Sequence, residues 1–301
     1  MVIVNKDSIN VSSGFVKVPA ASIKGNETWT PESSVFVSGR TLEIASFYMC
    51  DHEVTQAEFE AVVGTNPSSG NTDGDVGNNP VRCISLYDAI VYCNKLSLKE
   101  NLTPCYTVGD VDFANITYSD IPSESSDTWN AATCNFKANG YRLPTEAEWE
   151  WAARGGENYT YAGSDTIDEV SWYGDYYDKK THEIKTKKAN AYGLYDMSGN
   201  VYEWCWDWYS SSLSSTGATG PASGSSRFYR GGSWKYYYDD GDCTVFFRSL
   251  YLTVSRGKYI VQSLAFRFEG RAFCYLSGSA GRGTEGGHRN GAEGVVRRLK
   301  R

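Results

Sequence analysis

The stretch GYRLPTEAEWEWAARGG, residues 140–156, decides much of the local fold. Thr145 and Glu148 have the spacing of a capping box, in which each side chain bonds the backbone N–H of the other at a helix start. Pro144 lies directly before this pair. Gly155 is a natural stop, because glycine adopts the left-handed backbone conformation without steric cost. The stretch therefore predicts a short helix between Thr145 and Gly155.

Two further helices are predicted upstream by the same signals. In EVTQAEFEAVVG, Thr55 and Glu58 form a second capping box and Gly64 ends the helix. In SLYDAIVYCNKLSLKEN, Ser85 and Asp88 give an N-terminal cap pattern. Apolar side chains recur at helical spacing in both segments, so each helix has a face to bury.

The rest of the chain reads as short strands joined by long polar loops. β-forming segments predict strands at 15–18, 35–37 and 42–49. The 30 glycines and 22 tyrosines suit turns and short strands better than a helical bundle. Residues 276–301 change abruptly to Gly and Arg and predict a flexible tail. We therefore expect one α+β domain over 1–275, without an internal repeat.

The composition is that of a globular protein with an acidic body. Hydrophobic residues make up 41% of the 301 residues, and no run approaches the roughly 18 apolar residues that span a bilayer. The first residues, MVIVNKDSIN, show no signal peptide. The net charge is −7, and the tail holds six Lys/Arg and two Glu, which leaves −11 on the rest. This charge argues against nucleic acid or an anionic membrane as the main partner.

The eight cysteines and three histidines form no recognisable metal or hydrolase motif. There is no C-x-x-C pair and no Cys/His cluster with zinc-like spacing. Most of the cysteines are expected to be small buried hydrophobes, and one or two disulfides remain open. The three histidines, His52, His182 and His288, lack a supporting context and are expected to be surface or core polar groups.

A second stretch, residues 227–268, has an unusual composition between two ends that form a rigid-looking frame. It reads RFYRGGSWKYYYDDGDCTVFFRSLYLTVSRGKYIVQSLAFRF. The frame is 230–234 at one end and 265–268 at the other, and both parts are expected to be buried. Between them, Tyr and Asp gather without a period of 2 or 3.6. Such residues suit a binding loop, because Tyr offers stiff contact area with a polar tip and Asp adds charge-assisted acceptors. A β-hairpin with half-buried aromatics is the alternative.

Taken together, these blocks resemble the formylglycine-generating-enzyme, or sulfatase-modifying factor, family. The resemblance rests above all on RLPTEAEWEWAARGG with GLYDMSGNVYEWCWDW, and also on FVKVP, SFYMCDHEVTQAEFEAV, NPVRCISLYDAIVYCNKLS, RGGSW and AFRF. The blocks span about residues 15–268. The resemblance implies a C-type-lectin-like α+β fold with two main helices, short twisted antiparallel strands and long loops.

The resemblance also implies a chemistry whose central residues are missing from this chain. The family enzyme oxidises a substrate cysteine to formylglycine with a copper-bound cysteine pair, and soft thiolates suit Cu(I). The matching positions here are Tyr236 and Gly241, which cannot ligate a soft metal. Cys243 lies near but has no partner at the right spacing. No Ser-His-Asp, phosphate-loop or paired-carboxylate signature replaces the pair. We therefore expect no enzymatic activity.

In the family, the GNVYEW block can hold a calcium ion. The matching positions are Asn200, Val201 and Glu203. Oxygen donors at a turn suit calcium. A turn closed by hydrogen bonds is the alternative, and no cofactor is required in either case.

One branch of this fold fits residues 227–268 better than the enzyme does. The variable proteins of diversity-generating retroelements, which include a treponemal variable protein, keep the frame and vary the C-terminal surface. This resemblance implies a non-catalytic, monomeric ligand-binding protein at the bacterial cell surface or on an outer-membrane lipoprotein, with a protein or other surface ligand as partner. The expected ligand-binding residues are Tyr236, Tyr237, Tyr238, Asp239, Asp240, Asp242, Phe246, Phe247, Leu250 and Tyr251.

Two other interpretations of the same fold remain open. One is a divergent formylglycine-generating oxidase. The other is a non-catalytic structural or adaptor domain in which the aromatic stretch is incidental. The fold alone does not decide between them, because one fold hosts many functions.

Overall fold

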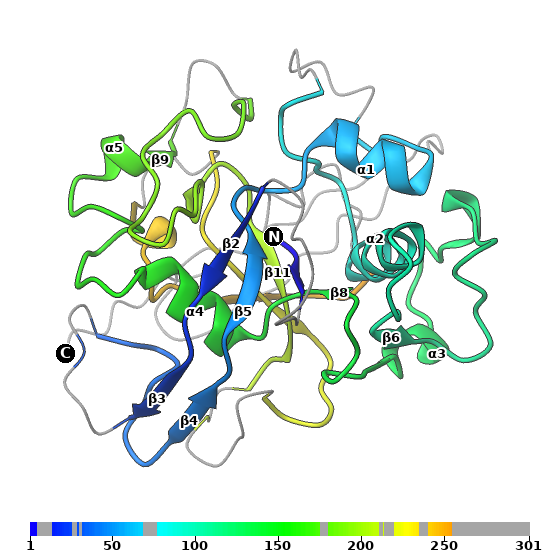
Figure 1. The fold of residues 1–301 in the computed structure, drawn as a ribbon, viewed down its shortest axis with the longest axis horizontal. Coiled ribbons are helices and arrows are strands. Elements are labelled where there is room, and N and C mark those ends of the chain that lie inside the picture. Colours follow the sequence, from blue (N-terminus) through cyan, green and yellow to red (C-terminus); the bar gives the residue numbers. More distant parts are fainter. Residues whose placement is uncertain are drawn as a thin grey trace, which may run out of the picture. The chain divides into compact units, whose positions relative to one another are not determined.

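The computed structural model describes most of the chain up to residue 254 (Figure 1). The described residues are 1–4, 14–25, 29, 32–68, 77–174, 180–210, 213, 220–234 and 240–254. All of them belong to one compact unit, Met1–Ser263. The predicted domain end at 275 and the predicted tail lie outside the described residues.

Short strands form several small sheets in the described part of the chain. One sheet contains β1 (Ile3–Val4), β2 (Phe15–Val18), β5 (Phe47–Cys50) and β8 (Tyr141–Arg142), in the antiparallel order β2-β5-β1-β8. A second contains β11 (Glu203–Trp208), β12 (Arg227–Arg230) and β13 (Ser249–Tyr251), also antiparallel and in that order. The remaining strands pair in twos: β3 (Ala21–Lys24) with β4 (Thr41–Ile44), β6 (Tyr106–Thr107) with β7 (Thr133–Cys134), and β9 (Ser171–Trp172) with β10 (Ser198–Gly199).

The three predicted helices all form with their predicted caps. They are α1 (Gln56–Val63), α2 (Leu86–Lys99) and α4 (Glu146–Arg154), and α2 and α4 are the longest described helices. Thr55, Ser85 and Thr145 are the N-caps, and each forms a complete capping box with the acid three residues later. Gly64 and Gly155 end α1 and α4 in the left-handed conformation, as predicted. Two single-turn helices, α3 (Asp127–Asn130) and α5 (Ile167–Val170), lie in the long loops.

Strand β2 forms as predicted, but two other strand predictions are wrong in detail. Residues 35–37 are not a strand, because Ser33 Oγ accepts hydrogen bonds from the backbone N–H groups of Val35 and Phe36 and closes a turn. The predicted strand 42–49 is two strands. β4 pairs with β3, whereas β5 pairs with β1 and β2, so the chain changes sheet in between.

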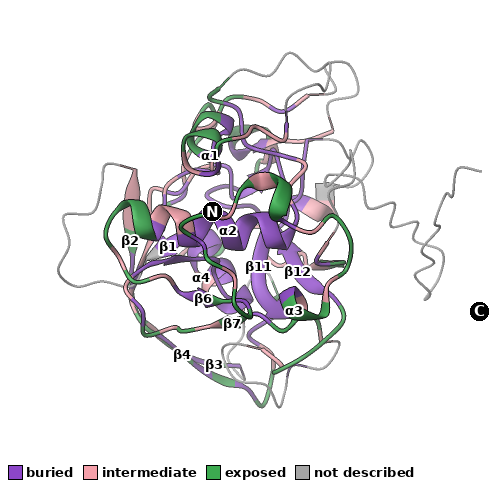
Figure 2. Cartoon of the chain, turned by 90° about the vertical axis from the view of Figure 1, so that its right-hand side faces the viewer, coloured by how far each residue is buried: buried purple, intermediate pink, exposed green. Residues whose placement is uncertain are grey.

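Two apolar clusters make up most of the core. One gathers around α2 and includes Tyr87, and the other gathers around α4 and includes Trp149. Strand β11 is buried along its whole length (Figure 2) and serves both clusters. Trp204 and Trp206 belong to the first, while Cys205 between them belongs to the second. This alternation is what a strand between two apolar layers requires.

The described cysteines behave mainly as core residues. Seven are described, all seven are free thiols, and five of them are buried.

The helices of the described part are too short or too polar for any of them to cross a membrane.

Candidate binding surface and its buried frame

The sequence RGGSW forms a buried turn at the end of β12. Residues 230–234 are all buried, as predicted. Gly231 and Gly232 have φ angles of +94° and +78°, where a side chain would be strained. A Cβ on Gly232 would lie 2.6 Å from Cys243 Sγ, so the turn packs directly on the segment that follows it. The other half of the predicted frame, 265–268, lies outside the described residues.

Two arginines tie this region to helix α4. The guanidinium of Arg230, which is fully buried, lies 3.2 Å from Glu146 and 2.7 Å from Glu150. Arg248 binds the second oxygen of Glu146 at 2.6 Å. Burial raises the pKa of Glu146, while the charges of both arginines oppose that shift. The glutamates of TEAEWE therefore form a buried ion network that holds the segment after β12 against α4.

Half of the predicted ligand-binding residues lie where side chains are not described. Residues 236–239 are outside the described part of the chain. For Asp240 only the backbone is described, and it starts a short 3-10 turn, Asp240–Cys243. These five positions include the three consecutive tyrosines, so the ligand-binding role of the tyrosines stays a prediction.

The other five predicted residues are described and differ in accessibility. Leu250, in the outer strand β13, is 40% exposed. Three rings are half-buried and pack against the core: Phe246, Phe247 and Tyr251. Asp242 is also half-buried, and its Oδ2 accepts a hydrogen bond from the Tyr202 hydroxyl at 2.9 Å. Leu250 is therefore the most exposed of the five in relative terms, while the other four are only partly accessible.

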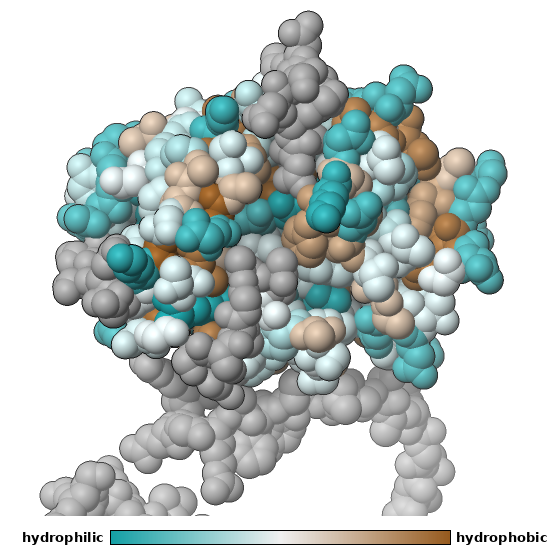
Figure 3. Space-filling view, turned by 60° about the horizontal axis from the view of Figure 1, so that its bottom comes forward, coloured by the Kyte–Doolittle hydropathy of each residue, from teal (hydrophilic) through white to brown (hydrophobic). Residues whose placement is uncertain are grey.

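Two more exposed apolar side chains lie beside this segment. Leu252, just after β13, is 53% exposed, and Tyr209, just after β11, is 38% exposed. The ring of Tyr209 lies 5.1 Å from that of Phe228, which pairs with Leu250 across the sheet. The sequence signal for Tyr209 is its place at the end of the buried aromatic run EWCWDW. Hydrophobic residues form separate patches among polar ones on the face drawn in Figure 3.

Among the described residues, no cysteine pair takes the place of the family enzyme's copper ligands. Gly241 occupies one matching position. Cys243 is 2% exposed and Cys205 is fully buried. Burial raises the pKa of the Cys205 thiol well above its usual range. A buried and protonated thiol is a poor nucleophile and a poor metal ligand.

The predicted calcium positions lie in a turn that is closed by hydrogen bonds. Asn200 has a φ of +58°, and its Oδ1 accepts the His182 N–H at 3.0 Å. Its amide nitrogen donates to Glu53 Oε2 at 2.7 Å, and the Val201 N–H donates to Glu53 Oε1 at 3.0 Å. Glu53 thus bridges the turn to the chain before α1.

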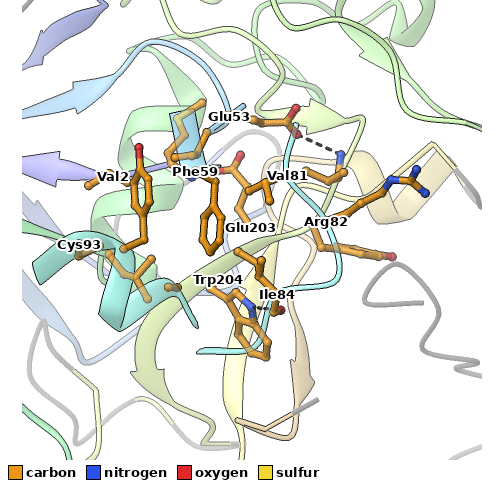
Figure 4. Close-up of a pocket in the computed structure, with 16 residues that line it drawn as sticks. Val2, Glu53, Phe59, Val81, Arg82, Ile84, Cys93, Glu203 and Trp204 are labelled. Carbon is orange, nitrogen blue, oxygen red and sulfur yellow. Dashed lines mark hydrogen bonds and ion pairs between the residues drawn. The ribbon is translucent and has the colours of Figure 1, made fainter. Parts of the chain in front are cut away.

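A second carboxylate, Glu203, lies beside Glu53 at a small pocket of about 70 Å³ (Figure 4). Burial raises the pKa of Glu53 well above its usual range, and the charges of Asp196 and Glu203 raise it further. Glu203 Oε2 lies 2.9 Å from the amino group of Met1, whereas its buried Oε1 has no hydrogen-bond partner among the described residues. Buried carboxylate oxygens are ligands that a hard cation accepts. A hard cation needs several such oxygens, and Asn200 Oδ1 already accepts the His182 N–H, so calcium binding stays a prediction.

Comparison with known proteins agrees with this architecture. Residues 4–257 match the family model described as sulfatase-modifying factor enzyme 1-like domain. A solved structure, Treponema denticola variable protein 1, is 39% identical with a TM-score of 0.72, and the match covers 81% of this chain and 91% of that one.

Two curated relatives carry different descriptions. The chaperone protein LppX of Paenibacillus barcinonensis is 40% identical over 208 residues, which is 62% of this chain and 71% of that protein. The formylglycine-generating enzyme of Streptomyces coelicolor is 38% identical over 126 residues, which is 36% of this chain and 40% of the enzyme. The chain therefore matches less than half the length of that enzyme.

Proposed function

Because the chain belongs to the sulfatase-modifying factor enzyme 1-like family, we propose that it keeps the family's C-type-lectin-like fold without its oxidase chemistry. Its function is to present a ligand-binding surface, centred on residues 235–252, on a rigid buried frame. The solved variable protein 1, which is alike over most of both chains, favours this function over catalysis.

One observation carries the proposal. Helix α4 holds the start of this segment in place, since Arg230 is fully buried between Glu146 and Glu150. On the same segment, Leu250 and Leu252 are 40% and 53% exposed. Fixed anchoring with exposed apolar side chains suits a binding surface, because a binding surface buries apolar area against its partner.

These residues suit a protein or other surface ligand. Tyrosine and phenylalanine are enriched at the cores of protein interfaces, and acidic groups at the rim favour a basic partner surface. A location at the bacterial cell surface or as an outer-membrane lipoprotein is part of the proposal and follows from the resemblance to the variable proteins.

Exchangeability of the surface gives a test that does not require the natural ligand. A library in which residues 236–239 and Leu250 are randomised is expected to consist mainly of folded proteins and to yield binders to a chosen target such as hen lysozyme. A matched library at the buried positions Phe228, Tyr229 and Trp234 is expected to lose folded members. Equal loss of folded members from both libraries would contradict the proposal.

The oxidase remains the second candidate because of the similarity to the Streptomyces coelicolor enzyme. Incubation with copper and a cysteine-containing sulfatase peptide distinguishes the two functions. No aldehyde product is expected here, since Gly241 cannot bind copper through a thiolate. Aldehyde formation that depends on a cysteine of this chain would establish the oxidase instead.

A further inference from the structure

Three exposed apolar side chains gather at one end of the sheet formed by β11, β12 and β13. In the described part of the chain five large apolar side chains are exposed, and three of them are Tyr209, Leu250 and Leu252. Single exposed apolar residues are normal on a protein surface, whereas a group of them marks a contact site. These three residues are called the apolar patch below.

The strand register places the apolar patch on one face of this sheet. Leu250 of β13 pairs with Phe228 of β12, and the side chains of such a pair project on the same side. Tyr209 reaches the same place from β11, because its ring lies 5.1 Å from that of Phe228. Leu252 follows Leu250 by two residues, so the alternation of a strand puts it on this face as well. Tyr251, between the two leucines, packs against the core cluster around α2 instead.

Tyr209 is held in place through both its backbone and its ring. Its backbone N–H donates to the Ser226 carbonyl at 2.7 Å. Its ring lies beside Phe228, which is fully buried, and the guanidinium carbon of Arg248 lies 4.2 Å from the centre of the Phe228 ring. Arg248 in turn binds Glu146 of α4 at 2.6 Å. A ring held in this way loses little side-chain entropy when a ligand covers it.

Tyr209 also lies outside the segment that is proposed to vary. It directly follows β11, whereas that segment lies within residues 227–268. The Tyr209 ring is therefore present whichever residues occupy positions 236–239 and 250. Because Tyr209 and Leu250 both lie beside Phe228, a ligand that covers this part of the surface also meets the Tyr209 ring.

The edge of the molecule next to the patch is acidic. Thr253, directly after Leu252, donates to Asn130 Oδ1 at 2.7 Å, so the chain after β13 lies beside α3. Residues 107–130 contain neither lysine nor arginine. The acids in this range are all exposed: Asp110, Asp112, Asp120, Glu124 and Asp127. Asp127 lies one helical turn before Asn130, so its charge is near the patch.

We propose, on the basis of the proposed function, that the apolar patch is a constant part of the binding surface and that its ligand is a basic protein. An apolar side chain of the ligand covers Tyr209 and Leu252, and its lysine and arginine side chains face the acids of residues 107–130. A rigid tyrosine is typical of the residues that carry most of the binding energy at an interface. Opposite charges speed the encounter and set its orientation.

The test uses binders of hen lysozyme, a basic protein, selected from the library at residues 236–239 and Leu250. Tyr209→Ser is introduced into several binders with unrelated sequences, and the Kd for lysozyme is measured. A loss of about tenfold or more is expected in most binders, because the shared ring contact is removed. Tyr209→Phe keeps the ring and is expected to retain the affinity. Leu98→Ser, which changes a similarly exposed side chain near the end of α2, is the matched control and is expected to leave the Kd unchanged.

The outcomes distinguish this inference from the proposed function. Binders that tolerate Tyr209→Ser as well as Leu98→Ser would overturn the apolar patch and leave the proposed function standing. Failure to select any binder from a folded library would overturn both. If Tyr209→Ser lowers the thermal unfolding midpoint, Leu252→Ser decides, because Leu252 is the most exposed residue of the patch. Weaker binding by Leu252→Ser supports the patch, and an unchanged Kd overturns it.

The charge of the partner is tested at the acidic edge. The double variant Glu124→Gln and Asp127→Asn is expected to slow association with lysozyme roughly several-fold at low salt and to leave dissociation nearly unchanged. Glu60→Gln with Glu183→Gln is the matched control, since it removes the same charge at exposed positions outside residues 107–130. Equal slowing in both double variants would reflect net charge alone and would overturn the role of the acidic edge.

Discussion

Replacing Glu150 by alanine is expected to cost about 3–5 kcal/mol of unfolding free energy, because it breaks a buried ion network at one shared carboxylate. Glu150 is fully buried and lies 2.7 Å from Arg230 and 2.9 Å from Arg154. Ser33 Oγ donates to the same carboxylate at 2.6 Å. Alanine leaves both guanidinium groups buried with less compensating charge. Since domains are stable by only about 5–15 kcal/mol, the loss is a large part of the total.

Urea unfolding of the Glu150→Ala variant and the wild type measures this loss as a shift of the midpoint at constant slope. Glu169→Ala is the matched control, since Glu169 and Lys188 form an exposed pair at 3.6 Å. The control is expected to change stability by less than about 1 kcal/mol. A Glu150→Ala loss as small as that of the control would show that the buried network stabilises the fold no more than an exposed ion pair. If the alanine variant does not fold, Glu150→Gln, which keeps the shape, is expected to show a smaller loss of the same sign.

Three further predictions concern the turn at Gly232, the pH dependence of the protein's stability and calcium binding. Gly232→Ala is expected to destabilise the protein by well over 1 kcal/mol in urea unfolding, because of its positive φ and its contact with Cys243, whereas Gly39→Ala, with positive φ but open space, costs only about 1 kcal/mol. Burial raises the pKa of Asp207 to about 7, so its contribution to stability is complete below about pH 4 and is lost as the pH rises to 7. Asp207→Asn is expected to flatten this fall in unfolding free energy between about pH 4 and pH 7. An unfolding free energy that depends on pH as in the wild type would contradict this expectation. Calcium is expected to raise the unfolding midpoint of wild type but not of Glu203→Gln, and equal shifts would place the ion elsewhere.

The helices could be predicted because their signals are local. Thr145 and Glu148 lie three residues apart, and the capping box they form depends on no distant part of the chain. The prediction of a strand at 35–37 was wrong because of another local contact. The hydroxyl of Ser33 accepts hydrogen bonds from backbone N–H groups that a strand would use for pairing. Composition alone does not show which of two local partners a backbone group takes.

The site was predictable only in part because its frame is built from distant residues. RGGSW marked the buried turn, but the partners of Arg230 lie 84 and 80 positions earlier at Glu146 and Glu150. Spacing in the sequence carries no signal for such a pair. His52 is the opposite case, since its partners Cys50 and Glu58 are near in sequence but do not match a known motif.

We propose that the tyrosines after RGGSW form an exchangeable surface outside the core. The most direct measurement is the unfolding free energy of a triple Tyr236→Ser, Tyr237→Ser and Tyr238→Ser variant, compared with Phe228→Ala in the buried strand β12. A change within about 0.5 kcal/mol is expected for each replaced tyrosine, and a loss of about 3–5 kcal/mol is expected for Phe228→Ala. A triple variant that loses as much stability as Phe228→Ala would show that the tyrosines belong to the core and not to an exchangeable surface.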